Sequence, residues 1–346
     1  LTTPGLWFGP QNAVRKVVRE LNEYAAKLQN DHPGRFGSFA SIYPPDTDGA
    51  LKEMEYALDK LKADGIALYT NYRDKWLGHD FFNPVWEELN RRKAVVYVHP
   101  IEAACCMNPV ADVGDTIIEY GADTTRTIAS LIFSGSSTKY PDIKWIFSHG
   151  GGMMPYVIER FLNGTTAELI PGIVTKGQGN IPPAKVPGGV LKELQKMYYD
   201  TAQASNPVAM SALRTVVPVT QILFGTDYWY RTAAETARGV EQVRAVDPHH
   251  AGFQLRRNAQ GAIDVLAPHR GGKAVAGVVG ELDRFLRASE AHGGEHRPEH
   301  FLARNAHVRL HVGEDRGLDK LPARHVRRQS RPQAADARRH AVSAGL

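Results

Sequence analysis

The sequence predicts an α/β fold, a TIM-like (β/α)8 barrel that is incomplete, and three observations favour it. Short apolar segments alternate with amphipathic helical segments through the first 240 of the 346 residues, which implies parallel strands joined by crossover helices. Polar residues follow several different strands, as expected where strand ends ring the mouth of a barrel. A doubly wound sheet would gather such residues at one switch point, and no glycine-rich phosphate-binding turn follows the first strand.

Six segments read as short buried strands, because each is a brief run of apolar, β-branched or aromatic residues. They are GSFASIYP (37–44), GIALYTNY (65–72), AVVYVHP (94–100), KWIFSHGG (144–151), MYYDTA (197–202) and QILFGTDY (221–228). Six strands are two fewer than a closed barrel of this type contains.

Helical patterns precede and separate these strands. Residues 11–34 predict a long amphipathic helix, and residues 46–64 predict another that opens on an aspartate cap and carries apolar residues at helical spacing. Residues 83–93 and 123–135 show the same pattern, and the second of these ends on Gly135.

The strand-end residues His99, His149, Asp200 and Asp227 carry the chemical signal. Two imidazoles and a carboxylate, from His99, His149 and Asp227, are ligand types for Zn²⁺, or for Mn²⁺ where oxygen ligands weigh more. The three glycines after His149 would let the backbone and an aromatic ring approach closely, because they carry no Cβ. We therefore expect a site at this end of the strands.

Each of these residues also has a structural interpretation. A single histidine at a strand end is more often a hydrogen-bonded structural residue than a ligand. Asp227 precedes RTAAET (231–236) and could be the cap of a helix there. The occurrence of all three at the same end of three strands favours the site.

Three motifs resemble a known family. VYVHP, FSHGGG with its following proline and arginine, and ILFGTDYWYRTAAE are similar to the amidohydrolase-related group that contains aminocarboxymuconate-semialdehyde decarboxylase and metal-dependent salicylate-type decarboxylases. The likeness covers about residues 1–240 and includes YYDTA. It implies a barrel of the metal-dependent hydrolase superfamily and decarboxylation of a small hydroxybenzoate, nearest to the 6-methylsalicylate type.

The resemblance also implies roles for individual residues. His99 matches a metal ligand after the fifth barrel strand, and Asp227 matches the ligand carboxylate after the eighth, which is also a candidate proton donor. His149 matches a histidine beside the metal that is catalytic or supports it. Arg160 matches an arginine that in some relatives enters the neighbouring subunit's pocket and holds the substrate carboxylate. A homodimer follows as an expectation, and a surface position for Arg160 is the alternative.

The substrate pocket has three further candidates. Trp76, Tyr228 and Trp229 are interpreted either as walls of a pocket for an aromatic ring or as ordinary packing residues. Both readings stay open at this point.

The chain departs from the family at its beginning. The family has a His-x-His or Glu-x-His ligand pair on its first strand, and this sequence begins after that strand, without an initiator Met. His32 and His79 are isolated in polar loops and do not form such a pair. A catalytically inactive, truncated family member is therefore one alternative, and a metal-dependent hydrolase of C–C, amide or lactone bonds is another.

The chain changes character near residue 240. Residues 1–240 carry 24 Lys+Arg and 25 Asp+Glu, whereas residues 241–346 carry 18 and 12, so the overall charge of +5 belongs to the second part. We expect residues 241–346 to form a basic Arg/Ala/Gly/His-rich tail that is disordered or loosely helical and resembles an out-of-frame translation. A charged interaction tail is an alternative, and nucleic-acid binding is not expected because acids are interspersed and stacking aromatics are missing.

The remaining features concern the cellular environment. Cys105 and Cys106 are the two cysteines, and adjacent cysteines rarely bridge, so a reducing cytoplasm is expected. No signal peptide or long apolar membrane segment is visible in the sequence.

Overall fold

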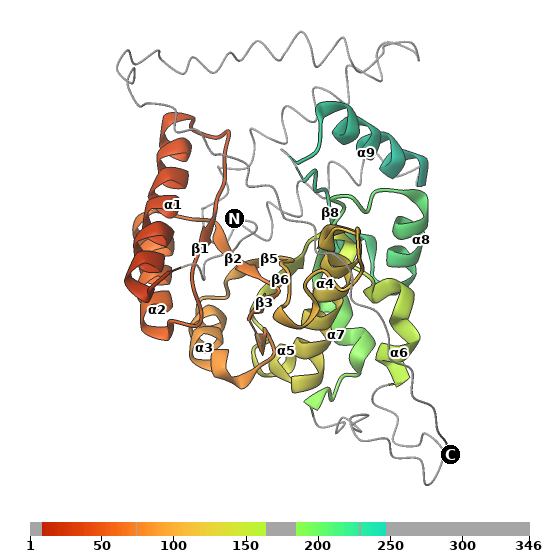
Figure 1. The fold of residues 1–346 in the computed structure, drawn as a ribbon, viewed down its shortest axis with the longest axis horizontal. Coiled ribbons are helices and arrows are strands. Elements are labelled where there is room, and N and C mark those ends of the chain that lie inside the picture. The colour runs from red at the N-terminus through yellow and green to blue at the C-terminus, as the bar shows by residue number, and fades with distance from the viewer. Residues whose placement is uncertain (1–8, 74, 164–184, 228–229, 247–346) are drawn as a thin grey trace, which may run out of the picture. The chain divides into compact units, whose positions relative to one another are not determined.

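A parallel sheet organises the part of the chain that the structure describes. The structure is a computed structural model, and it describes residues 9–73, 75–163, 185–227 and 230–246. Six parallel strands lie in the order β1-β2-β5-β6-β7-β8, and β3 and β4 form a separate antiparallel pair (Figure 1). The strands are β1 (Phe39–Ser41), β2 (Gly65–Tyr69), β3 (Asn71–Tyr72), β4 (Lys75–Trp76), β5 (Val95–His99), β6 (Lys144–Phe147), β7 (Tyr198–Asp200) and β8 (Ile222–Leu223). The α/β prediction is confirmed, and the sheet order is that of a partial barrel.

Helices connect successive strands of the sheet. The α-helices are α1 (Gln11–Asp31), α2 (Thr47–Glu55), α3 (Asn83–Arg91), α4 (Asp115–Ser134), α5 (Ser136–Lys139), α6 (Ile158–Asn163), α7 (Val190–Lys196), α8 (Pro207–Val216) and α9 (Ala233–Val246). Shorter turns are η1 (Tyr56–Lys60), η2 (Asp80–Phe82), η3 (Ala104–Cys106), η4 (His149–Gly151), η5 (Met154–Val157) and η7 (Val219–Gln221). None of the helices in these ranges is both long and apolar enough to cross a membrane.

Two predicted helix boundaries are present in the structure. The side chain of Asp46 accepts a hydrogen bond from the Gly49 N–H at 3.1 Å and so caps α2. Gly135 follows α4 with a φ of +86°, a left-handed conformation that favours glycine. The helix predicted over 46–64 differs in one respect, because α2 continues into the π-helical turn η1.

The two faces of the sheet pack against different partners. Outward-facing residues such as Val96, Val98 and Phe147 join the helices in the main core. The inner face, defined here as the face that carries Val95, Tyr97 and His99, holds a smaller cluster. Its members are Val95, Ile146 and Leu223, with Phe39, Tyr97 and Tyr198 packed against them. Because side chains alternate along each strand, the same spacing that fills both faces places His99 on the inner one.

Helix α1 covers the edge of the sheet at β1. Its buried residues Val14, Val18, Asn22 and Ala26 are spaced four apart, so they form one stripe. The Asn22 side chain donates to the Ser41 carbonyl at 2.9 Å and accepts from the Ser41 N–H at 2.8 Å. Two backbone groups of an edge strand are thereby satisfied by a side chain.

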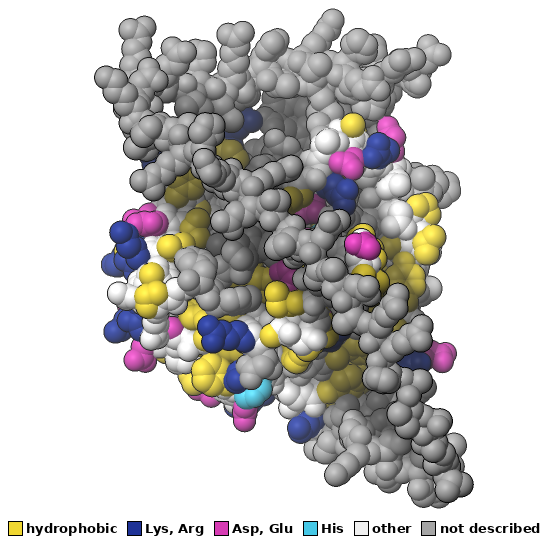
Figure 2. Space-filling view, in the orientation of Figure 1, with side chains coloured by type: hydrophobic (Ala, Val, Ile, Leu, Met, Phe, Trp, Pro, Cys, Tyr) yellow, Lys and Arg dark blue, Asp and Glu magenta, His cyan; other side chains and the backbone are white. Residues whose placement is uncertain are grey.

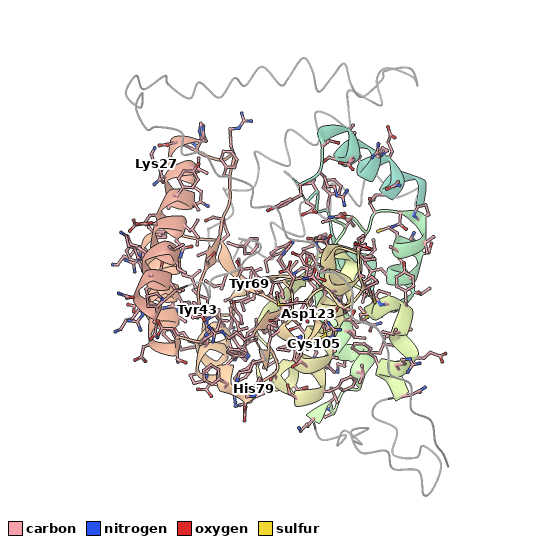
Figure 3. The ribbon with its side chains drawn as sticks, in the orientation of Figure 1. Lys27, Tyr43, Tyr69, His79, Cys105 and Asp123 are labelled. Carbon is pink, nitrogen blue, oxygen red and sulfur yellow. A yellow bond between two sulfur atoms is a disulfide. The ribbon has the colours of Figure 1, made fainter. Side chains whose placement is uncertain are left out.

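Helix α4 is tied to the β3–β4 hairpin through Asp123 (Figure 3). This carboxylate is fully buried and accepts hydrogen bonds from the Asn71 amide at 2.8 Å and the Trp76 indole N–H at 2.7 Å, as well as from the Thr70 hydroxyl. A buried charge costs free energy unless it is hydrogen-bonded, so this set of donors fixes the hairpin on α4.

The structure corrects the expectation for the cysteines. Cys105 and Cys106, both in the turn η3, are joined by a disulfide bond. The expectation that the adjacent residues do not bridge is therefore wrong.

The isolated histidines and the predicted tail can also be placed. His79 is exposed beside Asp80 at the surface, where Figure 3 labels it and Figure 2 shows a histidine in cyan. His32 is exposed after the end of α1. Helix α9 crosses residue 240 without interruption and buries Val240 and Val243. The tail predicted beyond it lies outside the described residues from 247 onward.

We predict that Trp86→Ala destabilises the fold by about 3–5 kcal/mol, the usual cost of removing a large buried aromatic side chain. Trp86 is fully buried, packs on the Phe82 and Trp145 rings, and donates its indole N–H to the Leu77 carbonyl at 2.8 Å. Urea denaturation measures the change. Val208→Ala is the control, since Val208 is 68% exposed and should change stability by less than about 0.5 kcal/mol. Equal effects of the two variants would contradict this packing.

Candidate metal centre and adjoining cavity

Three side chains from distant parts of the chain meet at one end of the sheet. His99 ends β5, His149 begins η4 directly after β6, and Asp227 follows β8. One ligand atom from each lies within 4.8 Å of the others. The imidazole rings of His99 and His149 are 5.3 Å apart between centroids and stand edge to face. Among the described residues, this is the one group of three or more potential ligands that are close enough to share an ion.

Backbone carbonyls orient both imidazoles. Nδ1 of His99 lies 2.8 Å from the Pro100 carbonyl oxygen, and Nδ1 of His149 lies 3.0 Å from that of Ala202. A carbonyl only accepts, so we assign the proton of each ring to Nδ1, which leaves Nε2 with its lone pair. This is the arrangement that metal-binding histidines use.

The protonation state of His99 suits a ligand. Its burial, with the nearby His149 adding to the effect, lowers the pKa of the His99 imidazole to about 4. The ring is therefore neutral near pH 7 and can donate a lone pair to a cation.

The backbone at the site adopts a conformation that non-glycine residues rarely take. His149 has a φ of +56°, and Gln203 and Asp227 both have a φ of +54°. A residue in the left-handed region typically costs about 1–3 kcal/mol when its surroundings enforce that conformation, and such residues cluster at functional sites.

Asp200 connects the strands beneath His149. One of its carboxylate oxygens, Oδ1, accepts from the backbone N–H groups of His149 and Ala202, each at 2.9 Å. The other, Oδ2, accepts from the Tyr97 hydroxyl at 2.8 Å. Burial raises the pKa of Asp200, and these hydrogen bonds together with the nearby His149 oppose the rise. Since His149 and Ala202 are also joined through Nδ1, Asp200 fixes the backbone of the same two residues.

The glycines that follow His149 allow close packing within the chain. A Cβ on Gly151 would lie 2.8 Å from the Tyr199 ring, and one on Gly152 would lie 2.2 Å from the Gly121 carbonyl oxygen of α4. Both residues also have a positive φ. The glycine run therefore lets η4 turn between β7 and α4, and Gly152 lies in the wall of the cavity described below.

Asp227 is not the cap of the next helix. Thr232 and Glu235 form a reciprocal capping pair, in which the Glu235 carboxylate accepts from the Thr232 N–H at 2.8 Å and the Thr232 hydroxyl accepts from the Glu235 N–H at 3.3 Å. The Asp227 carboxylate instead accepts a hydrogen bond from the Gln203 amide. It is thereby left beside the two imidazoles.

A cavity of about 680 Å³ adjoins this cluster. His99, His149 and Asp227 lie in its wall, with Gln203 and Arg231 near Asp227. Apolar and aromatic side chains from α4 and from the loops after β6 and β7 form further parts of the wall: Ile117, Tyr120, Met153, Ala204. The volume fits a small organic ligand.

Other predicted residues lie elsewhere. Arg160 is exposed on α6 and is not part of this cavity wall within a single chain. Trp76 is not in the wall either, since its indole binds Asp123, so the packing interpretation holds for it. Tyr228 and Trp229 fall outside the described residues.

Sequence reasoning missed Tyr120, Gln203 and Arg231. Tyr120 lies three residues before the helix predicted over 123–135, because α4 begins at Asp115, and nothing in the sequence distinguishes it from a packing residue. Gln203 and Arg231 did have a signal, because each lies within four residues of a strand-end polar residue.

We predict that Asp200→Ala destabilises the protein by about 2–5 kcal/mol, because two buried N–H groups and one hydroxyl lose their acceptor. Tyr97→Phe is the matched variant, which removes one of the three hydrogen bonds and should cost about 1–2 kcal/mol. Chemical denaturation gives both values. An Asp200→Ala variant no less stable than Tyr97→Phe would show that the hydrogen bonds from the His149 and Ala202 backbone N–H groups do not stabilise the fold.

Comparison with curated proteins finds decarboxylases. The chain is 38% identical over 247 residues to decarboxylase yanB of Aspergillus niger, a match that covers 66% of this chain and 63% of that protein. It is 34% identical over 235 residues to the 6-methylsalicylic acid decarboxylase of Penicillium expansum, covering 66% of this chain and 68% of that protein. The chain spans between about half and two thirds of the length of the curated relatives it matches.

Comparison with solved structures supports the fold. A structure described as an amidohydrolase II protein matches with a TM-score of 0.66 at 23% identity, covering 77% of this chain and 82% of that one. A dihydroxybenzoic acid decarboxylase from Polaromonas, solved with bound manganese and 2-nitroresorcinol, matches with a TM-score of 0.64 at 18% identity, covering 78% of this chain and 81% of that one.

The family model described as amidohydrolase matches residues 7–270. The decarboxylase group that the sequence motifs resemble is one branch of the amidohydrolase family. The chain therefore belongs to the amidohydrolase family.

Proposed function

We propose that this protein is a metal-dependent, non-oxidative decarboxylase of a small aromatic carboxylic acid, a hydroxybenzoate of the 6-methylsalicylate type. The observation that carries the proposal is the convergence of His99, His149 and Asp227 within 4.8 Å beside a cavity. The names of the relatives support the choice of reaction, since they include a 6-methylsalicylic acid decarboxylase.

The donor set fits a divalent metal. Two imidazole nitrogens and a carboxylate oxygen suit Zn²⁺ and also Mn²⁺, and Mn²⁺ is bound in the Polaromonas structure. His99 and Asp227 are the proposed ligands, and His149 is close enough to be a third or to act beside the ion. A bound ion would supply Lewis-acid chemistry at this position, stabilising negative charge on the substrate.

The chain's own residues would handle the proton. Decarboxylation needs a proton on the ring carbon that bears the carboxylate, followed by cleavage of the C–C bond, so that CO₂ leaves and the phenol remains. Where His149 acts beside the ion and not as a ligand, its free Nε2 can take up that proton and pass it on, because the Nδ1 proton is engaged by the Ala202 carbonyl. Asp227 is the alternative donor. Proton transfer by such a positioned group contributes a large part of many enzymes' rates.

The cavity wall would hold the ring. Ile117, Tyr120 and Met153 offer apolar or aromatic surface in the same wall as the histidines. An aromatic ring placed there displaces water from the reacting carbon.

A second copy of the chain belongs to this proposal as well. Arg160 is exposed on α6, as a side chain that reaches into a partner's cavity in a homodimer would be. A cytoplasmic location stays a prediction, since a disulfide between neighbouring residues does not identify a compartment.

Metal binding provides the first test. We predict that His99→Ala weakens the binding of Mn²⁺ or Zn²⁺ by more than the roughly 10–100-fold that loss of a group supporting a ligand causes. It should also abolish CO₂ release from 6-methylsalicylate. Isothermal titration gives the affinity and a CO₂ assay gives the rate. His79→Gln is the control, because His79 is exposed and lies outside the cluster.

The products separate the alternatives. Release of CO₂ with the phenol left behind supports decarboxylation, whereas a cleaved amide, lactone or C–C bond without CO₂ supports a hydrolase that uses the same cluster. Wild-type chain that binds neither metal and turns over neither type of substrate would support the catalytically inactive alternative.

A further inference from the structure

We infer that Arg231 is the residue of this chain that binds the carboxylate of the incoming aromatic acid, an inference that rests on the proposed function. Arg231 precedes the capping residue Thr232 of α9 and lies in the cavity wall. It is the single Lys or Arg among the described residues that form this wall. An anion that enters the cavity therefore meets one fixed positive side chain of the described chain.

The position of Arg231 relative to the metal cluster follows from Gln203. The Gln203 side chain donates its amide N–H to the Asp227 carboxylate and accepts from the Arg231 guanidinium. One amide group thus separates the positive side chain from the proposed ligand Asp227. A substrate carboxylate that displaced that amide would contact the guanidinium and would face the metal cluster.

The guanidinium has donors available for such a contact. An arginine carries five N–H donors in a planar fork that matches a carboxylate. Arg231 uses its two terminal nitrogens for Gln203 and for Glu235, and the Glu235 oxygen is 3.3 Å away. Glu235 lies one turn further along the chain, on α9, and its ion pair with Arg231 helps to orient the Arg231 side chain.

The contact would distinguish substrate from product. The acid is an anion at neutral pH, whereas the phenol that remains after loss of CO₂ is neutral, because the carboxylate leaves with the gas. A charge-assisted hydrogen bond to Arg231 therefore exists before the reaction and is absent after it. Arg231 would favour binding of the acid and release of the phenol.

Arg231→Gln tests this inference directly. Salicylate is the acidic probe and phenol is its neutral counterpart, and their affinities for the full chain are measured by titration with and without Mn²⁺. Loss of a charge-assisted hydrogen bond predicts that Arg231→Gln weakens salicylate binding by about 10–100-fold and changes phenol binding by less than about threefold. In turnover the KM for the acid should rise while kcat changes less.

Arg238 on α9 provides the control variant. Arg238 also pairs with Glu235, at 3.9 Å, but it is not part of this cavity wall. Arg238→Gln removes the same charge, so it should leave salicylate binding within about threefold of the wild type. Arg231→Lys keeps the charge without the planar fork and should restore part of the affinity. This variant also checks that a loss in Arg231→Gln does not come from misfolding.

Several outcomes would overturn the inference. They are equal losses for salicylate and phenol, equal losses in Arg231→Gln and Arg238→Gln, or no measurable salicylate binding by the wild type. A loss in Arg160→Gln without one in Arg231→Gln would assign the anchor to Arg160 of a second copy. Selective salicylate binding through Arg231 without CO₂ release would keep the carboxylate site and remove the proposed decarboxylation.

Discussion

The buried Asp200 carboxylate is the constraint on which the arrangement of the site depends. It takes hydrogen bonds from Tyr97 on β5, from His149 after β6 and from Ala202 after β7. His149 has a left-handed backbone, and such a conformation persists only where its surroundings over-determine it. Asp200 supplies the backbone contact, and the Ala202 carbonyl supplies the ring contact. The Asp200 carboxylate and the Ala202 carbonyl therefore set the direction of the His149 imidazole.

Two aspartates near the cluster have different chemistry because their surroundings differ. The oxygens of Asp200 are occupied by N–H and O–H donors in a buried layer. Asp227 lies in the cavity wall, and Gln203 is its partner there. A carboxylate whose lone pairs are already taken contributes to stability, whereas one that faces a cavity can take a cation. The environment therefore divides the roles between Asp200 and Asp227.

The sequence was a good guide where local pattern decides the structure. The six sheet strands, the Asp46 cap and the Gly135 terminus all follow from short-range periodicity and backbone preference. The β3–β4 hairpin could not be predicted, because two-residue strands carry no periodic signal and Asp123 of α4 fixes them from a distance of about fifty positions. The disulfide between Cys105 and Cys106 was not expected, because adjacent cysteines rarely bridge.

At the site, too, the sequence predicted some residues and missed others. Polar strand-end residues indicated His99, His149 and Asp227, since parallel strands bring such positions together. The sequence also singled out Asp200, but it could not show that backbone N–H groups occupy its carboxylate. Arg231 lies in the cavity wall four residues after Asp227, and its nearness to that strand-end aspartate was the signal that the sequence offered for it.

The position of Asp227 links metal binding to the last strand of the sheet and to the residues that follow it. Strand β8 has two residues and pairs with β7 at the end of the sheet order, and Asp227 lies four residues beyond it. The intervening loop is held by Thr201, whose hydroxyl accepts from the Gly225 N–H at 3.2 Å, and by Gln203. An ion held by Asp227 and His99 would bind the folded chain in preference to the unfolded one, so its binding free energy would add to the stability of the fold. The Arg231 backbone N–H donates to the Asp227 carbonyl at 3.2 Å, and Gln203 contacts both side chains, so the proposed metal ligand and the proposed carboxylate anchor are held in place together.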